Sequence, residues 1–365
     1  MLTRVFIDNF RCFVNFEFRP GSHQLILGGN GSGKSSLMDV LLLLRRFSVD
    51  GDSTAGDAIS RQRTRWLDKR EQVFELETSL AASTYRYRLV LDTTGTLIRV
   101  IEEIVHLNGK RLFAFRLGKV FLLDDRFEAK KPYELDLHRS ALATVPAKGN
   151  TKLIRFRNWL GELLGFRLNP FAIGARAENE DATPATDLSN LPGWYRHLVQ
   201  SNPGANNAFF ESLRTSFAGF DSLQLVTVGE NMRILTAEFQ QEAGIRSRFN
   251  FAELSEGQRC LIALYMILHF VVAKGRTVII DEPENFISLR ELQPWLLAAS
   301  DAIEDTGGQL LIVSHHPEFI NQWAPDFGIR FVRDESGAAR VEPFYGDPGS
   351  ELSPAELIAR GWENG

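Results

Sequence analysis

The feature that most constrains the fold of this chain is a glycine-rich segment between a predicted strand and a predicted helix. Residues 28–35 read GGNGSGKS and match the pattern G-x-x-x-x-G-K-[ST] in full. The short apolar run 24–27 precedes them, and a helical pattern over 34–46 follows. A loop in this setting binds phosphate, because backbone N–H groups and the helix N-terminus converge on its oxygens. About 0.01 such matches are expected by chance in a chain of this size.

The residue types in this loop predict a nucleotide such as ATP, with Mg²⁺, as the ligand. Lys34 is expected to reach the β- and γ-phosphates, and the Ser35 hydroxyl is expected to bind Mg²⁺. The other candidate phosphate contacts are Gly28, Asn30, Gly31, Ser32, Gly33 and Ser36.

Two carboxylates form a second candidate site. Asp281 and Glu282 follow a buried strand predicted over 277–280. Carboxylates at the carboxyl end of a strand in an open α/β sheet lie in the ligand crevice. Asp281 is therefore expected to bind Mg²⁺, directly or through water, and Glu282 to polarise the attacking water as a general base. Taken alone, the pattern also fits a strand that ends in solvated acids.

Two more segments are ambiguous when each is taken alone. Ser255 is a predicted N-cap for a helix over 255–272, with Gln258 at the capping-box position. A capped helix N-terminus also offers a second phosphate contact, to which Ser255 and Gly257 would contribute. His315 follows a buried strand predicted over 310–313, where a structural histidine is the simpler interpretation.

Taken together, the order of these motifs resembles that of the ABC-type ATPases. The similarity is greatest to the branch that contains the SMC proteins, RecF and the OLD-family ATPases. Residues 254–258 (LSEGQ) resemble the signature motif, and 281–284 (DEPE) resemble the acidic motif. The opening residues 6–13 (FIDNFRCF) resemble the first strands of this branch. Regions 1–46 and 250–335 carry the resemblance.

The resemblance implies a homodimer that closes on two ATP molecules. Lys34 and Ser35 of one subunit would face Ser255 and Gly257 of the other. His315 would contact the γ-phosphate and sense hydrolysis.

The resemblance also implies further site residues. Glu284 and Asn285 would fall in the loop that crosses the dimer interface. A glutamine that touches Mg²⁺ is expected as well, and Gln62 and Gln72 are both candidates.

The distribution of strands and helices predicts an α/β fold, namely a P-loop NTPase of ABC-ATPase type. Its mixed sheet core is expected to carry an antiparallel β-lobe and a helical subdomain. We expect a single domain built from residues 1–150 (N-terminal lobe), 151–250 (helical or variable insert) and 251–365 (C-terminal lobe).

Local patterns give more detail. Residues 73–123 alternate as an antiparallel meander with turns at 93–95 and 108–109, whereas 47–70 are expected to form a loop. Residues 152–217 are expected to be mainly helical, apart from a loop at 178–190. The strand-like runs 222–228 and 233–239 follow, and a helix over 289–303 is predicted after the acidic strand.

Composition limits the classes of partner. The chain of 365 residues has a formal net charge of −5, which excludes a globally basic nucleic-acid coat. Cys12 and Cys260 are too few for a disulfide framework. The longest apolar run, 260–273, is too short to span a membrane and is expected to be a core helix. We therefore expect a cytoplasmic protein with no membrane partner.

One basic cluster could still contact nucleic acid. Its cationic residues are Arg61, Arg63, Arg65, Lys69 and Arg70, and Trp66 lies among them. These residues could contact DNA phosphates while Trp66 stacks on a base. An exposed basic loop is the alternative.

The leading hypothesis is an ATP-hydrolysing dimeric switch in DNA repair, DNA surveillance or anti-phage defence. The chain shows no coiled-coil pattern between Lys34 and Ser255, and too few residues follow His315 for a fused toprim nuclease. The effector, such as a nuclease, is therefore expected to be a separate protein. A nucleotide-binding subunit of an ABC transporter is the alternative. A module that binds ATP without turnover is a third, against which Glu282 argues.

Overall fold

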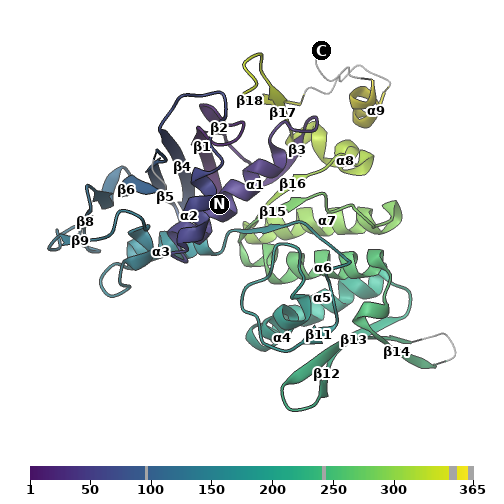
Figure 1. Cartoon of the computed structure of the whole chain (residues 1–365). Coiled ribbons are helices and arrows are strands. Elements are labelled where there is room, and N and C mark those ends of the chain that lie inside the picture. The colour runs from purple at the N-terminus through teal and green to yellow at the C-terminus, as the bar shows by residue number, and fades with distance from the viewer. Residues whose placement is uncertain (95–97, 241–243, 345–351, 361–365) are drawn as a thin grey trace. The chain divides into compact units, whose positions relative to one another are not determined.

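The computed structural model describes residues 1–94, 98–240, 244–344 and 352–360, and it is a mixed α/β protein as predicted (Figure 1). The chain forms two compact units. Unit 1 consists of Met1–Leu163 and the described part of Pro325–Asp347. Unit 2 consists of Leu164–Ala324 and the described part of Pro348–Trp362. The division into 1–150, 151–250 and 251–365 stays a prediction.

Unit 1 contains an antiparallel sheet in the order β2-β1-β4-β5-β6-β7-β8-β9. Side chains alternate along β4, where Phe74 and Leu76 are buried while Glu75 and Glu77 lie nearer to solvent. This confirms the predicted meander. The strands are β1 (Leu2–Asp8), β2 (Phe16–Phe18), β4 (Glu71–Leu80), β5 (Ser83–Asp92), β6 (Arg99–Leu107), β7 (Lys110–Arg116), β8 (Lys119–Leu122) and β9 (Tyr133–Glu134).

The turns of the meander follow two different rules. Asn108 and Gly109 have φ of 48° and 78° and join β6 to β7, as the sequence predicts. The turn between β4 and β5 instead places Ala81 and Ala82 at φ of 46° and 60°, a conformation that alanine rarely adopts. The predicted turn at 93–95 ends at Gly95, which lies outside the described residues.

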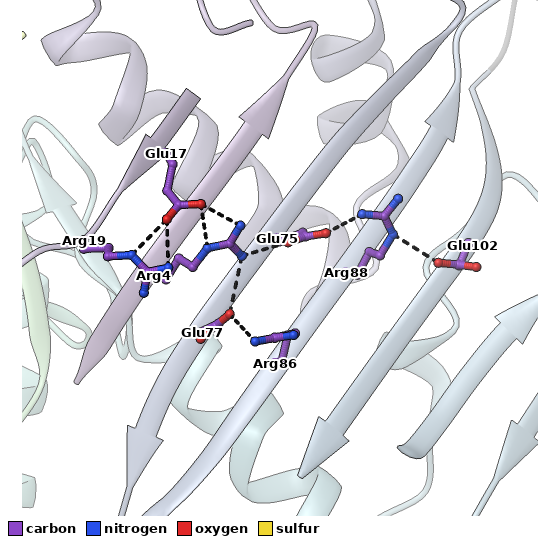
Figure 2. Close-up of polar contacts among 8 residues, drawn as sticks. All are labelled: Arg4, Glu17, Arg19, Glu75, Glu77, Arg86, Arg88 and Glu102. Carbon is purple, nitrogen blue, oxygen red and sulfur yellow. Dashed lines mark hydrogen bonds and ion pairs between the residues drawn. The ribbon is translucent and has the colours of Figure 1, made fainter. Parts of the chain in front are cut away.

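Cross-strand ion pairs run across this sheet from β2 to β6 (Figure 2). Arg4 on β1 contacts Glu17 on β2 at 2.9 Å and Glu75 on β4 at 2.8 Å. The series continues through Glu77 and Arg86 at 2.9 Å, and it reaches β6 where Arg88 contacts Glu102 at 3.2 Å. These pairs favour the observed register, because a slip by one residue would move the charges to the opposite face of the sheet, where Phe74 and Leu76 are buried.

Unit 1 also contains the strand and helix that flank the glycine loop. Strand β3 (His23–Leu27) leads into the loop and α1 (Lys34–Ser48) leaves it, as predicted. Strand β3 pairs in parallel with β17 (Gly328–Arg333), and β17 pairs antiparallel with β18 (Ala339–Pro343). The remaining elements of this unit are α2 (Ser53–Ser60), η1 (Leu142–Thr144) and α3 (Thr151–Gly161).

Helix α2 corrects the prediction that residues 47–70 form a loop. The Asp52 side chain caps the helix by accepting a hydrogen bond from the Thr54 backbone N–H at 2.9 Å. Ala55 and Ile59 are buried on one face. The run of Ser, Asp and Gly in this segment therefore starts a short helix instead of a loop.

A buried carboxylate joins the antiparallel sheet to the segment that follows it. Glu103 is fully buried and accepts hydrogen bonds from Tyr87 at 2.8 Å and Ser140 at 2.6 Å. Its second oxygen accepts from the backbone N–H groups of Ala141 and Leu142 at 2.7 and 3.2 Å. Burial raises the pKa of Glu103. Four donors surround one side chain, so the site requires an acceptor at both oxygens.

Unit 2 contains a parallel arrangement of three strands. Strand β15 (Thr277–Asp281) lies between β10 (Leu164–Phe166) and β16 (Gln309–Val313). Strand β15 confirms the predicted buried strand before the acidic motif, and β16 confirms the predicted strand before His315. Helices α6 (Glu256–Phe270) and α7 (Leu289–Thr306) also agree with the prediction and contact each other (Figure 1).

The insert departs from the helical prediction for 152–217. Helices α3, α4 (Leu191–Ser201) and α5 (Pro203–Ser216) are present, but β10 and β11 (Arg176–Ala177) interrupt them. Strands β12 (Phe220–Val228) and β13 (Met232–Gln240) form the predicted pair, and β14 (Arg246–Asn250) adds to β13. The other elements of unit 2 are η2 (Phe251–Glu253), η3 (Val272–Lys274), α9 (Pro354–Ala359) and α8 (Pro317–Phe327), whose last three residues belong to unit 1.

Helix α6 and the short η3 contain the apolar run that the sequence places in the core. Among the described residues, Glu256–Lys274 is one stretch that is long and apolar enough to cross a membrane. Of its most apolar window, 72% is buried inside the protein. That burial fits the core helix that the sequence predicts.

We predict that Glu103→Gln lowers the free energy of unfolding by about 2 kcal/mol, because the new amide would direct N–H groups at existing donors. Equilibrium denaturation in urea measures the change. Glu102→Gln on the same strand is the matched control, and loss of its surface ion pairs should cost at most about 1 kcal/mol. Equal losses for the two variants would contradict a special role for Glu103.

Candidate functional site

The glycine loop of unit 1 has a backbone that only glycine can adopt at several positions. Gly28, Gly31 and Gly33 have φ of 135°, 77° and 112°. A Cβ on Gly28 would lie 2.2 Å from the Phe331 carbonyl oxygen of β17. A Cβ on Gly33 would lie 2.9 Å from the Cys12 sulfur. The loop is therefore fixed both by its dihedral angles and by its close neighbours.

The Lys34 side chain folds back onto this loop and bonds to its backbone. Its Nζ donates hydrogen bonds to the carbonyl oxygens of Gly28 at 2.6 Å and Gly29 at 2.9 Å, and the residue is only 8% exposed. Helix α1 begins at Lys34, and its N-cap, Gly33, has no side chain to cap the first N–H groups. These N–H groups and a buried ammonium group together form a site for anionic oxygens.

One buried hydroxyl supports phosphate as the ligand of the loop. Ser32 is 4% exposed, and its Oγ has no hydrogen-bond partner among the residues that the structure describes. A buried hydroxyl without a partner costs free energy, and an anion in the loop would supply an acceptor. The residues present therefore fit a nucleotide phosphate.

A cavity of about 430 Å³ adjoins the loop within unit 1. Arg11 spans part of it and donates hydrogen bonds to Gln62 at 2.5 Å, Ser36 at 3.1 Å and Asp39 at 2.6 Å. Arg333 donates to the Gly31 carbonyl at 2.8 Å. The lining residues are Arg11, Cys12, Gly31, Ser36, Arg61, Gln62, Arg63, Arg65, Trp66 and Arg333. Several arginine side chains and the Trp66 ring thus lie beside the glycine loop.

The position of the cavity also distinguishes Gln62 from Gln72, two residues between which the sequence alone does not decide. Gln62 lines it, whereas Gln72 is fully buried and its amide donates to the Asn9 and Ile59 carbonyls. In the basic cluster, Arg61, Arg63, Arg65 and Trp66 line the cavity, and Lys69 instead pairs with Asp8 at 2.8 Å. Which glutamine contacts a metal stays a prediction.

The acidic strand of unit 2 ends in two carboxylates with different surroundings. Asp281 is buried, and its Oδ2 accepts two hydrogen bonds from Arg167 at 2.7 and 3.1 Å. Glu282 is exposed and has a φ of 53°, in the left-handed region. Its Oε2 accepts a hydrogen bond from Asn285 at 3.0 Å. The exposed carboxylate is the one that can reach a water molecule.

A third carboxylate holds the turn that carries the predicted switch histidine. Glu284 Oε1 accepts hydrogen bonds from the Ser314 hydroxyl at 2.6 Å and the His315 N–H at 3.3 Å. Burial raises the pKa of Glu284, and its Oε2 has no hydrogen-bond partner among the described residues. The His315 side chain is exposed. Two hydrogen bonds therefore join the acidic segment to the turn that contains His315.

The segment around Ser255 has the predicted capping box. Ser255 Oγ accepts from the Gln258 N–H at 3.2 Å, and Gln258 Oε1 accepts from the Ser255 N–H at 3.1 Å. A Cβ on Gly257 would lie 2.6 Å from the Phe286 carbonyl oxygen, so this position requires glycine. The start of α6 thus packs against the segment that follows the acidic motif.

The predicted site residues are divided between the two units. Unit 1 holds Gly28, Asn30, Gly31, Ser32, Gly33, Lys34, Ser35 and Ser36, and unit 2 holds Ser255, Gly257, Asp281, Glu282 and His315. No three His, Cys, Asp or Glu side chains gather as a metal site in the described part of the chain. Protein-bound Mg²⁺ commonly takes one or two protein ligands and completes its shell with phosphates and water, and the assignment of Ser35 and Asp281 as such ligands stays a prediction.

Sequence reasoning missed three arginines of these sites: Arg11, Arg167 and Arg333. Arg167 directly follows β10, a strand too short to be recognised from its own residues. Arg333 ends β17, which lies far along the chain from the loop that it contacts. A charged residue at the carboxyl end of a parallel strand was the available signal.

The fold is similar to that of several SMC head domains. The SMC head domain from Thermotoga maritima gives a TM-score of 0.51 at 14% identity, over 94% of this chain and 99% of the other. The SmcHead bound to the C-winged helix domain of ScpA gives 0.55 at 14%, over 98% and 99%. The Smc head with an extended coiled coil, bound to the C-terminal domain of ScpA derived from Pyrococcus furiosus, gives 0.50 at 12%, over 100% and 99%.

Comparison by sequence gives the family. No curated protein matches significantly. Residues 25–321 match the AAA_21 family model, described as AAA domain, putative AbiEii toxin, Type IV TA system. This range includes both the glycine loop and the acidic strand, together with the His315 turn. The chain therefore belongs to the AAA_21 family, and its fold is that of an SMC-head-like P-loop ATPase domain.

Proposed function

We propose that this protein binds and hydrolyses Mg²⁺-ATP, and that nucleotide binding closes a homodimer which gates a separate effector protein. The observation that carries the proposal is the chemistry of the glycine loop. The buried Lys34 ammonium group contacts this loop, and the loop itself contains the buried Ser32 hydroxyl, which has no partner among the described residues. Phosphate oxygens would accept from both groups and replace the carbonyl contacts of Lys34.

The two units supply different parts of the proposed chemistry. The loop N–H groups and Lys34 would bind and orient the phosphates, and Ser35 and Asp281 would hold Mg²⁺, which neutralises charge on the phosphates. Glu282 would orient a water molecule and accept its proton, since it is exposed and already fixed through Asn285. His315 would report the state of the γ-phosphate to Glu284 through the hydrogen bond between its backbone N–H and the Glu284 carboxylate.

The start of α6 supports the proposal of a dimer. Ser255 and Gly257 lie at a helix N-terminus, which favours anionic oxygens. Phe286 is 51% exposed beside this helix start, where a second subunit would cover it. We propose that the Ser255 segment of one subunit closes on the nucleotide bound by the glycine loop of the other.

The proposed pathway is DNA repair, DNA surveillance or anti-phage defence in the cytoplasm. Two of the similar SMC heads carry a bound ScpA domain, so this fold can present a partner surface. The family description names a toxin of a toxin–antitoxin system, which supports control of a harmful effector. The arginines of the cavity offer a route by which DNA could bias the switch.

We predict that Lys34→Ala weakens nucleotide binding about 10- to 100-fold, because it removes charge-assisted hydrogen bonds worth about 1.5–3 kcal/mol. Calorimetric titration with a non-hydrolysable ATP analogue measures the loss, and Lys119→Ala, at an exposed residue of β8, is the matched control. Equal affinity in Lys34→Ala and the wild type would overturn the assignment of the loop.

We predict that Glu282→Gln keeps nucleotide affinity while turnover falls by about 10²- to 10⁴-fold, as expected when a general base is removed. Phosphate release measures turnover, and light scattering with Mg²⁺-ATP should show an accumulated dimer. Glu304→Gln, at an exposed residue of α7, is the control. Undiminished turnover would remove Glu282 as the base, and a monomer at saturating ATP would contradict dimer closure.

The effector can be identified by affinity capture of tagged Glu282→Gln from its host with Mg²⁺-ATP, followed by mass spectrometry. Lys34→Ala, captured in parallel, reports binding that does not depend on nucleotide. We expect a nuclease or another toxic protein in the first sample alone. Recovery of recombination proteins or DNA alone would assign the protein to repair, and identical samples would contradict ATP-dependent gating.

A further inference from the structure

An arginine and the acidic motif meet where two neighbouring parallel strands end. Strand β10 runs parallel to β15, with Phe166 opposite Ile280. One step further along both strands brings Arg167 opposite Asp281. The contact is therefore a product of strand register and not of a chance surface encounter.

The contact engages a single carboxylate oxygen twice. Arg167 Nη2 and Nε donate to Asp281 Oδ2 at 2.7 and 3.1 Å. The Asp281 side chain is only 6% exposed, whereas that of Arg167 is 51% exposed. A carboxylate buried to this extent is costly without a counter-charge, and the guanidinium supplies one.

The backbone of Arg167 is fixed while its side chain reaches toward solvent. The Arg167 N–H donates to the Thr186 carbonyl at 2.8 Å, which ties the end of β10 to the loop before α4. The half-exposed guanidinium can leave Asp281 without unfolding this anchor. The neighbouring carboxylate, Glu282, accepts a hydrogen bond from Asn285 instead. Of these two acids, Arg167 therefore contacts Asp281.

We propose that Arg167 is a positioning residue that occupies Asp281 in the absence of Mg²⁺ and competes with the metal for it. The inference rests on the proposed function, in which Asp281 helps to hold Mg²⁺. Two cations at one buried carboxylate oxygen repel each other, and Mg²⁺ demands nearly ideal octahedral geometry. In this proposal the metal takes the Oδ2 atom that Arg167 holds, so Arg167 releases that oxygen when Mg²⁺ binds, which raises the Mg²⁺ concentration needed for the loaded state.

The test is a Mg²⁺ titration that does not depend on turnover. Binding of a fluorescent non-hydrolysable ATP analogue is followed as Mg²⁺ is raised from an EDTA-treated start, for the wild type and Arg167→Gln. We expect the Mg²⁺ midpoint of Arg167→Gln to fall about 3- to 10-fold. Its melting temperature in EDTA should also fall, and saturating Mg²⁺ with the analogue should restore it.

Three further variants isolate the pair. Arg167→Lys keeps the charge but loses the double contact, so it should shift the midpoint in the same direction by less. Arg176→Gln, an exposed arginine of the same unit, should leave the midpoint unchanged. In an Asp281→Asn background, Arg167→Gln should cause no further shift, because the shared acid is gone.

The outcomes separate this inference from the proposed function. A wild type without Mg²⁺-dependent nucleotide binding would refute the proposed function. A wild type with such binding, but an unchanged midpoint in Arg167→Gln and Arg167→Lys, would refute the competition alone. A midpoint that rises in these variants would also overturn it, because Arg167 would then support the metal site.

Discussion

The close approach of the glycine loop to strand β17 is the constraint on which unit 1 depends. A side chain on Gly28 would collide with the Phe331 carbonyl, and one on Gly33 would collide with Cys12. The loop can therefore lie against β17 and the turn after β1 only while both positions stay glycine. This arrangement sets where α1 begins, and with it the position from which Lys34 turns back to the loop carbonyls. The loop geometry that we propose to bind phosphate thus depends on contacts made outside the motif itself.

The acidic motif shows how neighbouring residues of similar chemistry take different tasks. Asp281 is buried beside an arginine, Glu282 is exposed at a left-handed turn, and Glu284 is half-buried against Ser314 and the His315 N–H. Each environment comes from a different neighbour: β10, the segment after the motif, and the turn after β16. The division of roles among the three acids is therefore a property of the sheet, and the sequence of the motif does not contain it.

The elements that the sequence predicts correctly have strong signals of their own. Strand β15 is buried along its whole length, helix α6 has an unbroken apolar run over 260–268, and the motif of the loop before α1 rarely arises by chance. The missed elements lack such signals. Strand β10 has three residues and owes its existence to pairing with β15. The turn at Ala81 and Ala82 contains no residue that favours a left-handed backbone, so the pairing of β4 with β5 must impose it.

The ion pairs across the antiparallel sheet have a consequence beyond register. Each of the four arginines in Figure 2 (Arg4, Arg19, Arg86, Arg88) contacts at least one of its four glutamates (Glu17, Glu75, Glu77, Glu102), and Glu102 also pairs with Arg116. Basic surfaces gain affinity for a polyanion by releasing condensed counterions, and each arginine here already has a carboxylate beside it. These paired arginines therefore offer a phosphate backbone less attraction than unpaired arginines would.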